Sequence, residues 1–207
     1  MVQSLFLGGG GDPEVSENFD REFFALLNPQ SRILYIPFAW KYPEQLPDCY
    51  KWFCGLVHRY LTIPENKISM YDGEKSYDLN TFDAIYIGGG NTYKLRHELE
   101  QYQLINPLRE FLASGKPLYG GSAGAIVFGE KIATVLEEKL SYPDYEGLKF
   151  CPFSMKCHYI PEEKEKLQKM AIQLQTTIYA IPEEGGLILD NNSHIIKQLG
   201  SVEKFDI

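Results

Sequence analysis

Apolar residues along the chain occur either in short continuous runs or at helical spacing, and the two kinds of segment alternate. Continuous apolar runs between turn residues are typical of strands that are buried on both faces. We predict such strands at residues 4–7, 33–38, 67–71, 84–87, 117–119, 148–153, 177–181, 187–189 and 194–197. Apolar residues three or four positions apart predict helices around residues 19–27, 46–57, 95–102 and 167–174, and a shorter helix is expected at 125–128.

Capping and turn residues predict some of the boundaries between these segments. Ser16 and Asn91 stand where side-chain oxygens would cap two of the helices. Asn191 and Asn192 predict a hairpin between the last two strands. The alternation of strands and helices predicts an α/β fold, in which a mainly parallel sheet has helices on both faces. The length of 207 residues favours one domain over residues 1–207.

Composition narrows the class of partner. The net charge of −8 argues against nucleic acid or an anionic membrane as the main partner. No apolar run approaches the ~20 residues of a membrane span, and the N-terminal residues lack the basic region of a secretory signal. We therefore expect a cytoplasmic location and reduced, buried thiols at the four cysteines, Cys49, Cys54, Cys151 and Cys157.

Three glycine-rich turns follow predicted strands, and two of the common nucleotide motifs are missing from them. The turn at residues 8–11 does not match G-x-G-x-x-G, because Pro13 occupies the third glycine position. None of the turns contains the GK[ST] sequence of a phosphate-binding loop. No metal-ligand constellation is visible either, so we predict no cofactor and no sensitivity to chelators.

The third turn carries the first candidate for chemistry. Residues 120–124, Gly-Gly-Ser-Ala-Gly, match G-x-S-x-G between a predicted strand and a predicted helix. This context is that of a nucleophile elbow, in which Ser122 would be exposed at the edge of the sheet. The backbone N–H of Ala123 could then face an oxyanion. The structural alternative is that Ser122 caps a helix at a tight strand–helix junction.

A nucleophilic serine needs a base, and the chain has four histidines. His58 and His97 lie inside predicted helices, and His194 lies in the terminal hairpin, where structural roles suffice. His158 follows an apolar segment and opens a loop after the serine, so it is the best candidate for the base. A histidine with a purely structural role is the alternative.

The base in turn needs a carboxylate that orients it. Glu183 and Glu184 lie just beyond the predicted strand at residues 177–181. Either one could hold the imidazole tautomer and stabilise the imidazolium. The alternative is an acidic turn in contact with solvent.

Two of these glycine motifs together resemble a known family. Residues 87–92 (Ile-Gly-Gly-Gly-Asn-Thr) and residues 120–125 (Gly-Gly-Ser-Ala-Gly-Ala) are similar to the peptidase E, or aspartyl dipeptidase, family, which includes cyanophycinases. The resemblance runs from residue 8 to about residue 189. It implies a three-layer α/β sandwich like that of class I glutamine amidotransferases, with serine in place of the elbow cysteine.

The resemblance also implies roles for individual residues. It implies Ser122 as nucleophile, His158 as base and Glu183 as the orienting acid, with Glu184 as the second choice. The residues implied for the oxyanion hole and for substrate binding are Gly89, Gly90, Asn91 and Ala123, with the turn at residues 88–90 supplying backbone amides.

One segment departs from the family pattern. In aspartyl dipeptidases, the segment after the histidine is longer and carries basic residues that are expected to recognise the aspartate of the substrate. Here residues 158–164 are acidic at their start and contain no arginine. A buried substrate carboxylate needs a charged partner, so strict preference for an N-terminal aspartate does not follow from the resemblance.

These observations predict a serine peptidase that hydrolyses short peptides through an acyl-enzyme, with Asp-X dipeptides as one candidate substrate. The expected partner is the peptide, and a homodimer is a possible assembly. Two alternatives stay open: another amide hydrolase of the same fold, and a catalytically silent peptide-binding protein. Ile160 stands where the class I amidotransferases have the second residue of a His-x-Glu pair, which argues against that enzyme class.

Overall fold

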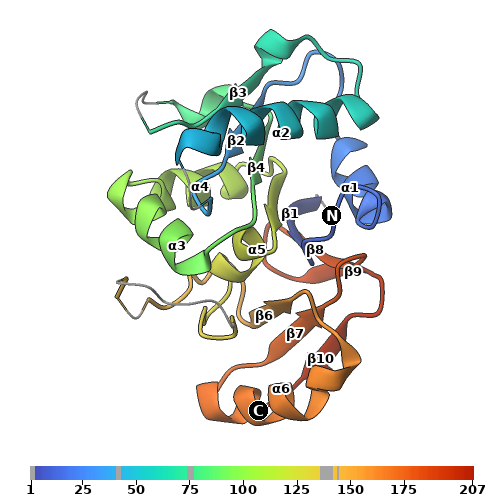
Figure 1. Ribbon diagram of the computed structural model, residues 1–207, viewed down its shortest axis with the longest axis vertical. Coiled ribbons are helices and arrows are strands. Elements are labelled where there is room, and N and C mark those ends of the chain that lie inside the picture. The colour runs from blue at the N-terminus through green and yellow to red at the C-terminus, as the bar shows by residue number, and fades with distance from the viewer. Residues whose placement is uncertain (1–2, 41–42, 74–76, 136–141, 144) are drawn as a thin grey trace.

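The chain forms a seven-stranded sheet with a smaller sheet beside it (Figure 1). The computed structural model describes residues 3–40, 43–73, 77–135, 142–143 and 145–207. Within this part of the chain, the strand order of the large sheet is β3-β2-β4-β5-β1-β8-β9. The strands are β1 (Gln3–Gly8), β2 (Ile33–Ile36), β3 (Ile68–Met70), β4 (Ala84–Ile87), β5 (Leu118–Gly121), β8 (Gly186–Asp190) and β9 (Ile195–Leu199). The first five pair in parallel, while β8 runs antiparallel to both β1 and β9.

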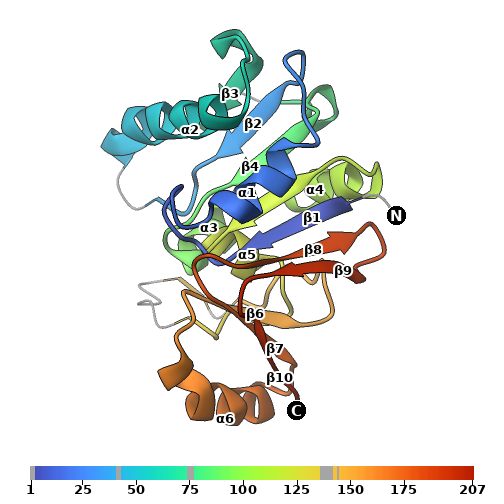
Figure 2. The same ribbon diagram turned by 90° about the vertical axis from the view of Figure 1, so that its right-hand side faces the viewer.

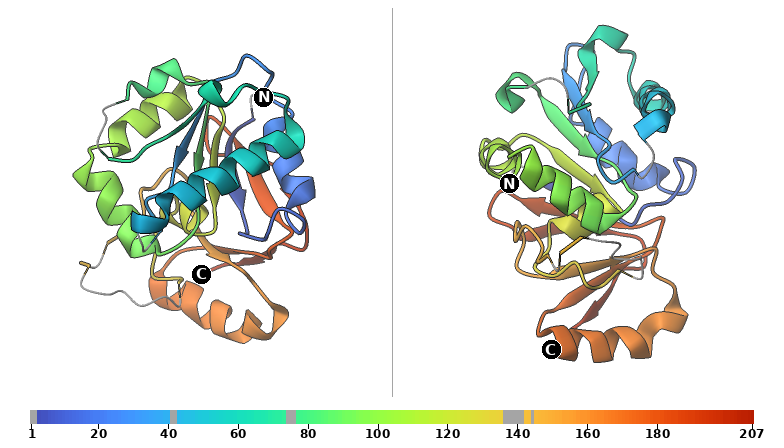
Figure 3. Two further views of the ribbon diagram at one scale, coloured as in Figure 1. Left: turned by 45° about the horizontal axis from the view of Figure 1, so that its top comes forward. Right: turned by 60° about the vertical axis from the view of Figure 1, so that its left-hand side comes forward.

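Helices cover both faces of the large sheet (Figure 3). On one face lie α1 (Glu17–Phe24) and α2 (Leu46–Tyr60). On the other face lie α3 (Thr92–Gln101), α4 (Ile105–Ala113) and α5 (Ala123–Val127). This arrangement confirms the predicted α/β fold with a mainly parallel central sheet and helices on both faces.

Alternation along the strands explains why both faces are covered. In β4, Ile85 and Ile87 pack into the core under α3, α4 and α5. Tyr86, between them, packs with Phe23 of α1 and Phe53 of α2 in the opposite core. Successive side chains of a strand point to opposite faces, so a strand that is apolar at every position needs an apolar layer on each side.

The smaller sheet lies at one end of the molecule (Figure 2). Its order is β10-β7-β6, with β6 (Ser154–Cys157) parallel to β7 (Ile178–Ile181) and β10 (Glu203–Phe205) antiparallel to β7. Helix α6 (Lys164–Leu174) packs on this sheet through Leu167 and Ala171. Short 3₁₀ turns occur at Pro43–Gln45, Glu65–Lys67, Leu79–Thr81 and Pro161–Glu163.

One predicted strand is wrong, and three elements were not predicted, besides the short 3₁₀ turns. Residues 148–153 are irregular, and the strand of this region is β6, immediately after them. Their backbone follows the end of α5 instead of a neighbouring strand, as in the bond from the N–H of Phe150 to the carbonyl of Phe128. Their apolar side chains are buried in the core all the same, and burial alone does not distinguish a strand from an irregular segment. Besides β6, the pattern did not reveal helix α4 and the three-residue strand β10.

The boundary predictions had mixed outcomes. The side-chain oxygen of Asn91 accepts a hydrogen bond from the N–H of Lys94 at 2.9 Å, which confirms this helix cap. The antiparallel pair β8–β9 confirms the hairpin. Ser16 stands at the N-cap position of α1, but its hydroxyl does not cap the helix and donates to the Asp20 carboxylate at 2.8 Å instead. A buried carboxylate one turn further on is the stronger acceptor for this hydroxyl.

Two further predictions concern the cysteines and membrane spans. All four cysteines are free thiols, as expected; three are buried, but Cys49 is partly exposed, contrary to prediction. In the part of the chain that the structure describes, no helix combines the length and apolar character of a membrane span.

Candidate active site

Ser122 forms a strained turn between β5 and α5. Its backbone angles are φ 51° and ψ −111°, a conformation that non-glycine residues rarely adopt. The turn is held by the bond from its N–H to the carbonyl of Gly8, 3.0 Å long. It is also held by close packing, because a Cβ on Gly124 would lie 2.4 Å from the carbonyl oxygen of Ile87. The Ser122 side chain makes no capping bond to α5, so the helix-cap alternative does not describe its side chain.

His158 faces this serine from the small sheet. It follows β6 directly, and its φ of 51° turns the chain sharply at the strand end. Its N–H donates to the carbonyl of Gly9 at 3.1 Å, which ties the turn to the end of β1. Nε2 of the imidazole lies 2.8 Å from Oγ of Ser122. The carboxyl ends of β5 and β6 therefore bring together two residues that are 36 positions apart.

Glu183 contacts the other nitrogen of the same imidazole. It follows β7, the strand beside β6, and its Oε1 lies 2.9 Å from Nδ1 of His158. In the tautomer that satisfies both contacts, Nδ1–H donates to Glu183 and Nε2 accepts the Ser122 hydroxyl proton. Glu184 is exposed and makes no such contact. Of the two carboxylates that sequence reasoning left open, Glu183 is the one that reaches the histidine.

The glycine turn after β4 lies beside Ser122. A Cβ on Gly89 would stand 3.2 Å from Cβ and 3.7 Å from Oγ of Ser122, so the backbone of Gly89 borders the hydroxyl. Within the described residues, the N–H groups of Gly89 and Ala123 have no protein acceptor. Gly90 packs against Ala39, and the N–H of Asn91 donates to the carbonyl of Ala39. Gly89 thus borders the hydroxyl and Ala123 follows Ser122 in the chain, both with free amides, while the bond from Asn91 anchors the turn against Ala39.

The other three histidines have their own contacts. His58 lies in α2, His97 in α3 and His194 beside the β8–β9 hairpin. The partners are the carbonyl of Ile63, the hydroxyl of Tyr145 and the carboxylate of Asp190, respectively. These contacts agree with the structural roles expected for them.

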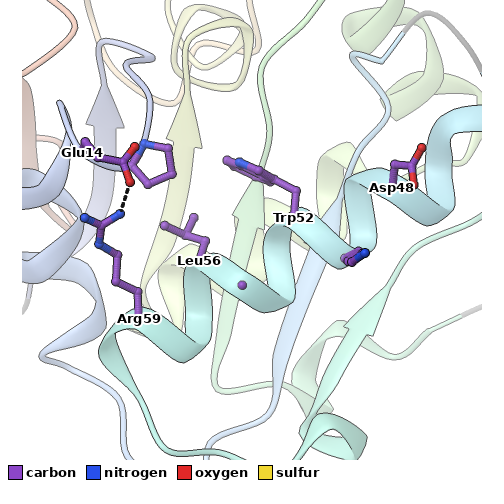
Figure 4. Close-up of a pocket in the computed structure, with 8 residues that line it drawn as sticks. Glu14, Asp48, Trp52, Leu56 and Arg59 are labelled. Atoms are coloured by element: carbon purple, nitrogen blue, oxygen red, sulfur yellow. Dashed lines mark hydrogen bonds and ion pairs between the residues drawn. The ribbon is translucent and has the colours of Figure 1, made fainter.

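A cavity of about 560 Å³ opens in front of Ser122. It lies between the loop after β1 and the N-terminal half of α2. Its lining consists of glycines, aromatic rings and short polar side chains: Gly10, Gly11, Asp12, Tyr35, Trp40, Gln45, Asp48, Cys49, Trp52, Tyr86, Gly89, Gly121 and Ser122. A second hollow continues along α2 and shares Asp48 and Trp52 with the first (Figure 4).

Apart from Ser122, the side chains that line this cavity were not predicted from the sequence. Trp52 of α2 lines the cavity and is 43% exposed, although its neighbour Phe53 is fully buried. A tryptophan next to the apolar face of a helix is a usable signal, since tryptophan side chains are highly buried on average. Asp48 carries no such signal, because an acidic residue in the first turn of a helix is ordinary.

Two proteins named peptidase E are similar to parts of this chain. Peptidase E of Shewanella sp. (strain W3-18-1) is 47% identical over 78 residues, which cover 37% of this chain and 33% of that protein. Peptidase E of Haemophilus influenzae (strain ATCC 51907) is 32% identical over 138 residues, which cover 61% of this chain and 63% of that protein. The match therefore spans between one third and slightly less than two thirds of these two relatives.

A solved structure supports the same fold over the whole chain. A crystal structure of a protein described as a peptidase E from Listeria monocytogenes EGD-e superposes with a TM-score of 0.67. The identity is 23%, and the match covers 100% of both chains. The model of the family named "Peptidase family S51" matches residues 5–202. This chain is a member of peptidase family S51.

Proposed function

We propose that this protein is a serine-type peptidase that hydrolyses short peptides through an acyl-enzyme on Ser122. The observation that carries the proposal is the pair of contacts on one imidazole, at 2.8 Å to Ser122 and at 2.9 Å to Glu183. A hydroxyl, a base and an orienting carboxylate in hydrogen-bond reach of one another are the requirements of nucleophilic acyl transfer.

In the first half of the reaction, Oγ of Ser122 attacks the carbonyl carbon of the scissile bond. Nε2 of His158 accepts the hydroxyl proton, and Glu183 stabilises the imidazolium through Nδ1–H. The carbonyl oxygen becomes an oxyanion, for which the free N–H groups of Gly89 and Ala123 are the donors that we propose. His158 then gives its proton to the amine, which leaves as the bond to carbon breaks.

In the second half, water attacks the acyl-enzyme while Nε2 of His158 accepts a proton from it. The tetrahedral intermediate collapses, the proton returns to Oγ of Ser122, and the acid product leaves. The mechanism calls on no metal. No group of three or more histidine, cysteine, aspartate or glutamate side chains suited to a metal ion exists among the described residues.

The substrate class is inferred from the family. The relatives include proteins named peptidase E and, in Drosophila melanogaster, a probable alpha-aspartyl dipeptidase that is 25% identical over 229 residues. We infer short peptides as substrates, with Asp-X dipeptides as a class to be tested. A cytoplasmic location, a homodimer and the absence of a nucleic-acid partner stay predictions.

The test is hydrolysis of a dipeptide and tripeptide library, including Asp-X and β-aspartyl members, followed by mass spectrometry. We expect cleavage by the wild type and its loss in Ser122→Ala. The matched control is Ser201→Ala, which removes an exposed hydroxyl outside the site. Equal cleavage by Ser122→Ala and the wild type would contradict the proposal, and binding without cleavage by either would favour a silent peptide-binding protein.

A further inference from the structure

Four aromatic side chains contribute to the lining of the cavity in front of Ser122: Tyr35, Trp40, Trp52 and Tyr86. Trp40 and Trp52 are 40% and 43% exposed, which is unusual for side chains of this size. The rings of Tyr35 and Tyr86 lie 6.3 and 6.5 Å from the ring of Trp52, so three rings meet in one corner of the cavity. Aromatic faces carry a negative electrostatic potential and attract cations.

The charged side chains that line the cavity are two carboxylates, Asp12 and Asp48. Asp12 and Asp48 are exposed, and neither carboxylate forms a hydrogen bond or ion pair with a described residue. The charge of Asp48 also affects the thiol of the adjacent Cys49. Burial is the main cause that raises the pKa of the Cys49 thiol, and the negative charge of Asp48 raises it further. The cavity therefore combines negative charge with aromatic faces.

No basic side chain balances this charge within the described lining of the cavity. Lys51 and Arg59 line the neighbouring hollow on α2 instead. Figure 4 shows that Arg59 points to Glu14, and the two form an ion pair at 2.6 Å. The guanidinium of Arg59 is thus already occupied at the far end of α2.

We propose that this cavity binds a positively charged side chain of the substrate, next to the scissile bond, and that Asp48 is a specificity-determining residue. The inference rests on the proposed function, because it takes Ser122 as the reacting group. A guanidinium or ammonium group would meet two carboxylates and the faces of the tryptophans. A substrate aspartate would meet like charges and no described cation, which disfavours it.

The experiment uses peptide pairs that differ only in charge. Arg-Ala and Ala-Arg are compared with the same dipeptides carrying citrulline, a neutral isostere of arginine. Asp-Ala and Ala-Asp are compared with their asparagine counterparts. We expect kcat/KM to favour arginine over citrulline by about fivefold or more on one side of the scissile bond, and asparagine over aspartate on the same side.

Variants assign the preference to the cavity. In Asp48→Asn, the arginine-to-citrulline ratio should fall toward one, and Asp12→Asn offers a second variant outside the helix. The matched control is Glu110→Gln, which removes an exposed carboxylate from α4 on the opposite face of the sheet. A merely structural role of Asp48 in the first turn of α2 would lower kcat/KM for both peptides equally and leave the ratio unchanged.

Failures of the two proposals give different results. Preference for aspartate over asparagine, or equal rates for arginine and citrulline, would overturn the inference while Ser122-dependent cleavage upholds the proposed function. Cleavage that survives Ser122→Ala would overturn the proposed function. In that event, NMR titration of Ser122→Ala with the same peptides still measures the charge preference, and equal dissociation constants would overturn the inference as well.

Discussion

The imidazole of His158 lies directly against the α-carbon of Gly10. A Cβ built on Gly10 would stand 2.8 Å from Nε2 of His158 and 2.6 Å from Cβ of Ser122, and the φ of Gly10 is 98°. The contact between the proposed nucleophile and base therefore depends on a residue without a side chain, placed in a backbone region that favours glycine.

Gly10→Ala is expected to lower kcat/KM by about 100-fold or more, because the new methyl group must displace the imidazole or the serine. Steady-state hydrolysis of a cleaved peptide measures the effect. Gly55→Ala is the matched control, since a Cβ there meets nothing within 4 Å. Wild-type activity in Gly10→Ala would show that the contact is not needed for hydrolysis.

Glu183→Gln is expected to lower kcat by about 10⁴-fold, as a neutral amide no longer orients Nδ1–H or stabilises the imidazolium. Glu184→Gln should keep wild-type kcat, because this carboxylate does not contact His158. Single-turnover and steady-state kinetics on both variants decide between the two residues. The reverse pattern of losses would assign the orienting role to Glu184.

Lys156 and Glu163 form a sheltered ion pair at 3.3 Å, with side chains that are 10% and 15% exposed. Lys156→Met leaves the Glu163 carboxylate without its partner, and we expect the free energy of unfolding to fall by about 3 kcal/mol. Lys164→Met breaks the exposed pair with Glu203, at 2.8 Å, and should cost less than about 1 kcal/mol. Urea unfolding measures both values. Equal losses would contradict the prediction that the buried ion pair contributes more to stability than the exposed one.

The buried carboxyl of Asp20 is expected to make the free energy of unfolding depend on pH. Burial raises the pKa of this carboxyl above its usual 3.8, although hydrogen bonds from Tyr119 and Ser16 act in the opposite direction. A raised pKa in the folded state means that the stabilising contribution is fully present below the unfolded pKa and is lost as pH rises through the folded pKa. The free energy of unfolding of the wild type, minus that of Asp20→Asn, should therefore decrease from about pH 3 to pH 7. Urea unfolding at each pH measures it. A difference that grows with pH would contradict this sign.

The sequence predicted those features whose structure is determined by residues close together in the chain. The G-x-S-x-G turn at residues 120–124 places its serine between a strand and a helix as expected. The β8–β9 hairpin and the cap at Asn91 follow from turn and capping chemistry in the same way.

Features that depend on distant contacts were not predictable in this way. The apolar side chains of residues 148–153 are buried by packing against the end of α5, not by strand pairing. The cavity in front of Ser122 lies between the loop after β1 and α2, and nothing local in either segment indicates that Asp12 and Asp48 line the same cavity. Position along the chain named His158 and left Glu183 and Glu184 open, and the family resemblance favoured Glu183. Their distances to each other and to Ser122 came only from the fold.

Ser122 belongs to the seven-stranded sheet, whereas His158 and Glu183 follow two strands of the three-stranded sheet. A hydrogen bond from the N–H of His158 to the carbonyl of Gly9 crosses the seam between them. The reacting groups are therefore aligned only while the two sheets stay docked. A perturbation that separates the two sheets would abolish hydrolysis while each sheet is still folded. Activity would therefore be lost before secondary structure is.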